Sequence, residues 1–191
     1  MSVATRTIPQ TRSQGLALRW RVVGAVLPLV LLALWAGGLL LFGTATDGPR
    51  IGQPAPDFAL TDLDGNPVQL SDLQGRPVIV NFWGSWCGDC VEEFPLLQEA
   101  LNRHQADGLA VLGIVVRDNS ESARAFMARM GATWTAAMDP GGMTATSFAI
   151  SGAPESFFID RDGVVRGRQI GRLTASDLQR QLAQTLNPDG E

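Results

Sequence analysis

Residues 77–90 read PVIVNFWGSWCGDC, and this stretch decides the fold. The run Pro77–Trp83 is apolar and of strand length, as expected for a strand buried on both faces of a sheet. A short loop follows, and the pattern predicts that a helix begins near Cys87. Cys87 and Cys90 then lie in the first helical turn, three positions apart, where two thiols close a small disulfide with little rearrangement.

The start of the predicted helix gives the two cysteines different roles. A helix N-terminus stabilises negative charge on the first sulfur. We therefore predict Cys87 as the exposed nucleophile and Cys90 as the resolving thiol, buried behind it. They are the only cysteines of the chain.

Three other interpretations of the cysteine pair fit the sequence less well. A zinc site needs about four ligands, and His104 is the only histidine. An inert structural disulfide with so small a loop would constrain the unfolded chain very little. A peroxidase of the peroxiredoxin type would have a hydroxyl residue three positions before its cysteine, where this chain has Gly84.

Strands and helices alternate on both sides of this stretch, and several turns are recognisable, such as Asp64–Pro67 and Arg161–Gly163. The order β-β-β-α-β-α-β-α-β-β-α predicts an α/β fold with a mixed central sheet flanked by helices. The expected strands are residues 57–60, 68–70, 77–83, 109–116, 134–138, 156–160 and 164–170, and the expected helices start near 87 and 120 and span 143–148 and 176–186.

The N-terminal part of the chain has a different composition. Residues 1–21 carry four arginines and no acidic residue, and residues 22–43 carry no charge. A helix of about 22 residues is roughly 33 Å long, close to the hydrocarbon thickness of a bilayer. The positive-inside rule predicts a cytoplasmic tail at 1–21, a transmembrane anchor at 22–43, a linker at 44–56 and an extracytoplasmic domain at 57–191. A cleaved signal peptide is the alternative, and it exports the same domain.

The charge of the chain excludes some classes of function. The net charge of −4 divides into +4 for residues 1–21 and −8 for the rest, so the domain lacks the positive surface of a nucleic-acid-binding protein. All 15 basic residues are arginines. Without lysine, Schiff-base chemistry and a P-loop are excluded.

From Ile51 to Leu186 the chain resembles the thioredoxin superfamily, specifically the exported thiol-disulfide oxidoreductases of the TlpA/ResA/CcmG type. The resemblance rests on the cysteine motif with Glu93-Phe94-Pro95 after it and on three further motifs. These are IGQPAPDF at 51–58, VNFW at 80–83 and GAPESFFID at 152–160. The dipeptide Gly88-Asp89 departs from relatives that have a proline between the cysteines.

The resemblance implies roles for five further residues. Pro154 matches a cis-proline that faces the dithiol, and Ala153 before it would offer backbone hydrogen bonds to a substrate segment. Glu93 matches a carboxylate beneath the dithiol that influences its protonation. Glu155 matches an acidic residue that helps to line an acidic groove. Trp86 is expected to pack beside the nucleophile.

The resemblance also implies a function. A membrane-anchored domain of this type reduces protein disulfides outside the cytoplasm, with apocytochrome c as the expected client and a membrane electron donor of the CcdA/DsbD type. No cofactor or metal is expected. General thiol-disulfide exchange, including protection against oxidants, is the alternative. A copper chaperone is the alternative from another class, with Met138, Met143 and His104 as a thin set of ligands.

Overall fold

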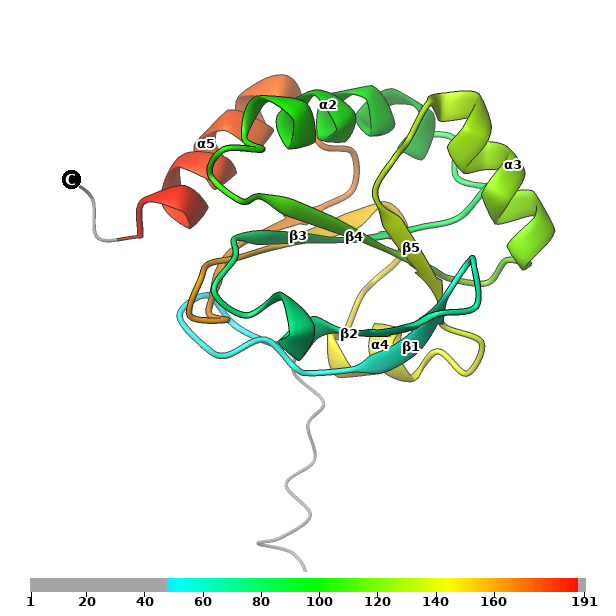
Figure 1. The fold of residues 1–191 in the computed structure, drawn as a ribbon, viewed down its shortest axis with the longest axis horizontal. Coiled ribbons are helices and arrows are strands. Elements are labelled where there is room, and N and C mark those ends of the chain that lie inside the picture. The colour runs from blue at the N-terminus through cyan, green and yellow to red at the C-terminus, as the bar shows by residue number, and fades with distance from the viewer. Residues whose placement is uncertain (1–47, 189–191) are drawn as a thin grey trace, which may run out of the picture. The chain divides into compact units, whose positions relative to one another are not determined.

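The computed structural model describes residues 48–188 (Figure 1). Their elements follow in chain order: β1 (Ala59–Asp62), β2 (Pro67–Gln69), the 3-10 helix η1 (Leu70–Leu73), β3 (Val78–Trp83), α2 (Cys90–Arg103), β4 (Ala110–Val115), α3 (Ser120–Met130), β5 (Thr135–Met138), α4 (Met143–Ser147), β6 (Glu155–Ile159), β7 (Val165–Ile170) and α5 (Ala175–Leu186). Most bounds lie within one or two residues of the predicted ones.

The strands form one sheet in the order β2-β1-β5-β4-β3-β6-β7. The neighbours β3, β4 and β5 are parallel, while β6 is antiparallel to β3 and β7 is antiparallel to β6. This confirms the predicted α/β fold with a mixed sheet. β3 lies inside the sheet between β4 and β6, and all six of its residues are buried, as its apolar run predicted.

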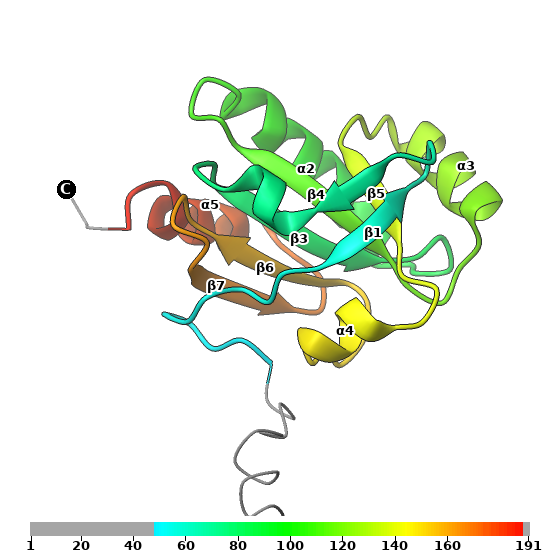
Figure 2. The same cartoon turned by 60° about the horizontal axis from the view of Figure 1, so that its bottom comes forward.

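Helices cover the sheet on both faces. α2, α3 and α5 lie on one face, and the short helix α4 lies on the other (Figures 1 and 2). Because successive side chains of a strand point to opposite faces, β3 contributes Ile79 and Trp83 to the core under α2 and Phe82 to the core on the α4 side. The second core also contains Phe148, which directly follows α4.

The start of α2 differs from the prediction. The helix begins at Cys90 instead of near Cys87, with Asp89 as its N-cap residue. Two overlapping turns lead into its first residues, because Val91 N–H donates to Gly88 O and Glu92 N–H donates to Asp89 O. Cys87 therefore lies before the helix, and Cys90 is its first residue.

The N-terminal predictions fall mostly outside the described residues, including the tail at 1–21 and the transmembrane segment at 22–43. Among residues 48–188, none of the helices combines the length and the apolar character needed to cross a membrane. The predicted linker at 44–56 extends too far. Gly52 N–H donates to Val165 O at 2.8 Å and Ala55 N–H to Gly163 O at 2.9 Å, so the folded domain begins before residue 57. The Gly and Pro residues of this segment correctly indicated irregular backbone, but this backbone is hydrogen-bonded to the rest of the domain.

Candidate active site

Cys87 and Cys90 form a disulfide, with their Cα atoms 5.4 Å apart. The backbone N–H of Cys90 donates to Sγ of Cys87 at 3.2 Å. The first N–H of α2 is thus aimed at the first sulfur, where it would stabilise a thiolate after reduction. Cys87 is 4% exposed and Cys90 is 0% exposed. Cys87 is therefore the more accessible of the two, but it is not exposed as predicted, because it packs in the core cluster under α2.

Trp86 directly precedes Cys87 and packs against the loop that carries it. Its side chain is half exposed, and its Nε1–H donates to Val116 O at 3.2 Å, directly after β4. The indole lies against Gly84, where a Cβ atom would come within 2.4 Å of Nε1. Only glycine at position 84 permits this position of Trp86, which is a physical reason for the absence of a hydroxyl residue there.

The loop before the cysteines is held by a carboxylate from the loop that follows β4. The backbone N–H of Ser85 donates to Oδ2 of Asp118 at 2.6 Å. β3 and β4 are parallel, so their carboxyl ends lie side by side and the loops after them meet. Asp118 therefore fixes the segment that carries Trp86 and Cys87.

The Ala153–Pro154 peptide bond is cis, the isomer that the resemblance implied. Phe82 of β3 pairs with Glu155 of β6, so Pro154 lies at the level where β3 ends and the loop to Cys87 begins. Ala153 packs against both core clusters, including the one that holds the two cysteines. The structure thus brings the cis-proline and the cysteine motif to the same edge of the sheet.

Glu93 is fully buried, three residues after Cys90 on α2. Its Oε1 accepts a hydrogen bond from Nδ2 of Asn81 at 2.8 Å, and its Oε2 accepts from the N–H of Leu173 at 3.3 Å. Asn81 Nδ2 also donates to Ser156 Oγ at 3.0 Å. The carboxyl group therefore has neutral donors as partners and no ion pair among residues 48–188.

Burial raises the pKa of Glu93 to about 7. The hydrogen bonds from Asn81 and Leu173 act in the opposite direction, and the negative charge of Asp89, one turn before Glu93, raises the pKa further. A carboxyl group that titrates near neutrality can both accept and donate a proton under physiological conditions.

Glu155 has a different environment from the one that the resemblance implied. Its side chain is buried, 1% exposed as a residue, and it forms an ion pair with Arg168, whose Nε donates to Oε1 at 2.6 Å. Its Oε2 accepts from the N–H and the hydroxyl group of Ser151. Arg168 also donates to Ala149 O. Glu155 is therefore buried below the surface, and its hydrogen bonds to Ser151 hold the loop that leads into the cis-proline.

A cavity of about 710 Å³ opens beside Trp86 and the loop 149–153. Two of its lining residues are charged. Asp139 is buried and accepts hydrogen bonds from the N–H groups of Thr144 and Ala145. Arg117 is exposed and forms no hydrogen bond or ion pair within residues 48–188. Glu155 is not among the residues that line this cavity, because its carboxylate is buried and paired with Arg168.

Sequence reasoning missed two polar members of the site, Asn81 and Ser156, and also Asp118. Asn81 gave a signal, since it is a polar residue in the middle of a buried apolar strand, where an amide needs a partner. Ser156 could be found only from the pairing of Asn81 with Ser156 between β3 and β6. Asp118 follows a buried strand that is parallel to β3, a position where loops converge.

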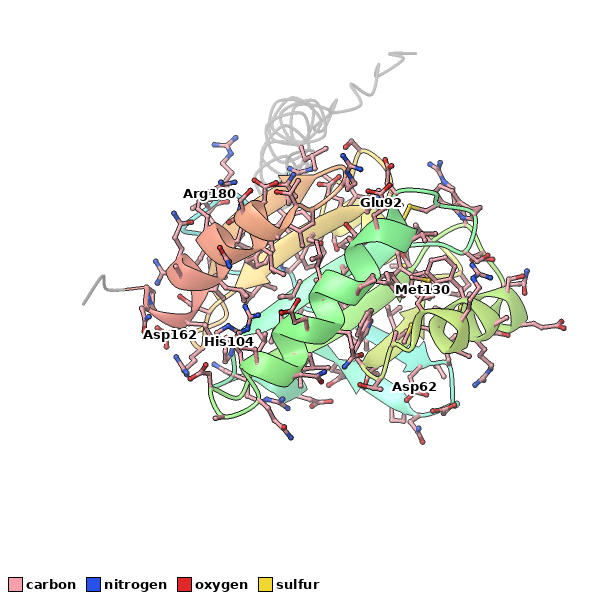
Figure 3. All side chains as sticks on the ribbon, turned by 90° about the horizontal axis from the view of Figure 1, so that it is seen from above. Asp62, Glu92, His104, Met130, Asp162 and Arg180 are labelled. Atoms are coloured by element: carbon pink, nitrogen blue, oxygen red, sulfur yellow. A yellow bond between two sulfur atoms is a disulfide. The ribbon has the colours of Figure 1, made fainter. Side chains whose placement is uncertain are left out.

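Of the three residues considered as copper ligands, His104 lies at the end of α2 opposite to the cysteines, whereas Met138 packs against the core cluster that contains them. His104 pairs with Asp107 at 2.8 Å. Figure 3 labels it at one end of α2, with Glu92 at the end that carries Cys90. Met138 ends β5 and Met143 begins α4. Within residues 48–188 no cluster of three His, Cys, Asp or Glu side chains is placed to hold a metal ion.

The fold has a disulfide at the start of α2 and a cis-proline at the same end of β3, and this arrangement is that of a thioredoxin-like thiol-disulfide oxidoreductase. Residues 51–168 match the AhpC/TSA family, and the chain belongs to this family.

Relatives and solved structures agree with this assignment. The thiol-disulfide oxidoreductase ResA of Bacillus anthracis is 31% identical over 161 residues, which cover 83% of this chain and 93% of that protein. The thiol:disulfide interchange protein DsbE of Allochromatium vinosum is 34% identical over 79% of this chain and 86% of that protein. A crystal structure of a DsbE-type protein from Chlorobium tepidum superposes with a TM-score of 0.68 at 35% identity, over 73% of this chain and 99% of that chain.

Proposed function

We propose that the protein is a membrane-anchored reductase of protein disulfides outside the cytoplasm, with apocytochrome c as its client. The observation that supports it best is the Cys87–Cys90 disulfide at the start of α2, beside the cis Ala153–Pro154 bond and an open cavity. The backbone of residues 152–154 and the side chain of Trp86 would seat an extended client segment across the cysteine pair.

The reaction transfers two electrons to the client. The reduced protein attacks a client disulfide with the Cys87 thiolate, which forms a mixed disulfide and releases one client thiolate. The Cys90 thiolate then attacks Sγ of Cys87, which releases the second client thiolate and leaves the Cys87–Cys90 disulfide. In this proposal Glu93, three residues after Cys90 on α2, takes the proton of Cys90 before this second step and returns it when the pair is reduced again.

An exported reductase needs a supply of electrons, because its compartment favours disulfides. We propose a membrane-embedded dithiol donor of the CcdA/DsbD type, which would reduce the Cys87–Cys90 disulfide by the same exchange in reverse. The anchor at residues 22–43 would keep the domain close to this donor.

Trapping the mixed disulfide tests the function. Cys90→Ser keeps the nucleophile and removes the resolving thiol, so the client stays attached to Cys87. Expressed in the native host, Cys90→Ser should trap a small set of proteins dominated by apocytochromes c and one membrane donor, identified by mass spectrometry. Cys87→Ser is the matched control and should trap almost nothing.

The outcomes of this experiment separate the alternatives. A broad collection of unrelated exported proteins supports general thiol-disulfide exchange instead. Equal trapping by the two variants contradicts the assignment of Cys87 as the nucleophile. A domain that binds copper tightly and traps no protein at all would support the chaperone function.

Fractionation tests the anchor. The full-length protein should stay in the membrane fraction through salt and alkaline washes, and protease added from outside should reach the folded domain. A soluble mature chain that begins near Thr46 would contradict the anchor and support a cleaved signal peptide.

A further inference from the structure

Asn81 is a fully buried amide with an incomplete set of partners. Its Nδ2 donates to Glu93 at 2.8 Å and to Ser156 at 3.0 Å, which uses both of its N–H groups. Its Oδ1 is buried and has no hydrogen-bond partner within residues 48–188. An acceptor without a donor is unfavourable in the interior of a protein and therefore calls for an explanation.

The partners of Glu93 suit only one of its two protonation states. Asn81 and Leu173 both donate to the carboxyl group through N–H groups. Two donors stabilise a carboxylate. A neutral carboxyl group carries an O–H that needs an acceptor, and neither of these partners offers one in the arrangement described. Something near Glu93 has to change when the group is protonated.

We propose that Asn81 is a two-state partner of Glu93, whose side-chain amide turns over when Glu93 gains or loses its proton. Rotation by about 180° about the Cβ–Cγ bond exchanges Oδ1 and Nδ2 in nearly the same volume. Oδ1 then accepts from the Glu93 O–H and from the Ser156 hydroxyl group. In either orientation one polar atom of the amide lacks a partner, so the proton on Glu93 decides which orientation is favoured.

The other groups near Glu93 do not replace this acceptor. Asp89 on the same helix is exposed and acts through its charge. Arg172, beside Leu173 on the loop before α5, is exposed and forms an ion pair with Glu92. The sulfur atoms of Cys87 and Cys90 are joined in the disulfide, and a sulfur atom is a weak acceptor. Asn81 from β3 is the side-chain amide that lies within hydrogen-bonding distance of the Glu93 carboxyl group.

This makes Asn81 a positioning residue for the proton that Glu93 carries. With a partner for each protonation state, Glu93 can exchange a proton with Cys90 without leaving a buried O–H or a buried carboxylate unpaired. The benefit to turnover rests on the proposed function. The amide reorientation itself is measurable on the oxidised full-length protein without any client, so the two can fail separately.

Nuclear magnetic resonance of the full-length protein in detergent, labelled at asparagine and glutamate, tests the reorientation. At pH 9 the Asn81 amide protons should show Overhauser contacts to the Glu93 and Ser156 side chains. At pH 5 these contacts should be lost, and the pH midpoint of their loss should equal the midpoint of the Glu93 carboxyl titration. Glu93→Gln should abolish the change. Unchanged contacts at both pH values, while Glu93 titrates, would overturn the proposal.

Substitutions give an independent measurement. Asn81→Leu is nearly isosteric and removes the partner of both protonation states. Because a hydrogen bond to the charged carboxylate is stronger than one from the neutral O–H, the midpoint of Glu93 should rise by the difference, no more than about one pH unit. Ser156→Ala is the matched control, because it removes the other partner of Asn81 and leaves the contact to Glu93, and its midpoint should move far less. Equal shifts in the two variants contradict the proposal. If Asn81→Leu does not fold, the measurement on the unchanged protein decides.

Discussion

Two buried glutamates lie beside the active site, and their side chains have opposite kinds of partner. Glu93 and Glu155 are 0% and 1% exposed. Glu155 has a cation, since Arg168 forms an ion pair with it, and two further donors from Ser151. Glu93 has neutral donors, and burial raises its pKa to about 7. β6 separates the two environments, because it turns Glu155 to one face of the sheet and Ser156, near Glu93, to the other.

The different partners decide what each carboxyl group can do. A carboxylate paired with a guanidinium keeps its charge and holds its neighbours in place. Glu155 thereby fixes the loop 149–151, in which Ala149 has a left-handed backbone with φ of 46°. A carboxyl group without a cation in the interior changes its protonation state easily. This difference supports the proposed role of Glu93 in proton exchange, whereas Glu155 holds the loop before the cis-proline.

Removing the cation of Glu155 should have the largest effect on stability. Arg168→Met leaves a buried carboxylate without its partner, and we expect the free energy of unfolding to fall by about 3 kcal/mol. Urea unfolding followed by circular dichroism measures this. The double variant Glu155→Gln with Arg168→Met should recover part of the loss, because no unpaired charge is then buried.

Arg180→Met is the control for this measurement. Arg180 forms an ion pair with Asp177 on the surface of α5, where both partners reach solvent. Such a pair contributes less than about 1 kcal/mol. If Arg168→Met costs no more than Arg180→Met, the two buried glutamates do not differ as described.

Glu93 should make stability depend on pH in the direction opposite to an ion-paired carboxylate. Its pKa rises from 4.5 to about 7 on folding, so the native state binds a proton that the unfolded state has released in this interval. Its contribution is fully present below pH 4.5 and is lost as the pH rises through about 7. Between pH 5.5 and pH 8 the loss should be about 2 kcal/mol. Urea unfolding of the parent and of Glu93→Gln at both pH values measures it, since the variant lacks this slope.

The same variant should also change turnover. Glu93→Gln keeps the shape of the side chain but cannot exchange a proton with the dithiol, so the pH dependence of disulfide reduction should become flatter around pH 7. Steady-state rates from pH 5.5 to pH 8.5 test this. A profile that overlays the parent would reduce Glu93 to a buried helix residue without a part in the reaction.

Much of the fold and part of this comparison could be predicted from the sequence. The apolar strand before Cys87, the turns at Gly65 and Gly163 and the helical periodicity are local patterns, and they gave the elements in the correct order. Glu93 was singled out because the motif after Cys90 resembles that of the family. These features depend on residues that are close in the chain.

The remainder depends on contacts that spacing along the chain does not reveal. Glu155 and Arg168 lie on neighbouring strands of a hairpin, where Arg168 is the partner of Phe157, so their meeting follows from register and side-chain direction. Asn81 reaches Ser156, 75 residues further along the chain, through the pairing of β3 with β6. For this reason the sequence could suggest that Glu155 belongs to the site, but it could not reveal that its carboxylate is buried and paired with Arg168.

The smallest effect concerns Asp89, the charge that acts on Glu93 from between the cysteines. It raises the pKa of Glu93, as the weakest of the causes described above, and negative charge there also opposes a thiolate at Cys87. Asp89→Asn should therefore lower the pKa of Glu93 slightly and stabilise the reduced pair. Stabilising the dithiol makes the couple more oxidising, by about 10 mV for an exposed charge. Equilibration with glutathione buffers at pH 7 measures the potential.

Asp162→Asn removes the same charge from the turn between β6 and β7, away from Glu92 and the cysteine end of α2 (Figure 3), and should leave the potential unchanged. A shift of equal size in both variants would mean that net charge acts on the couple from a distance. A more reducing Asp89→Asn would mean that the first turn of α2, and not this carboxylate, governs the thiolate.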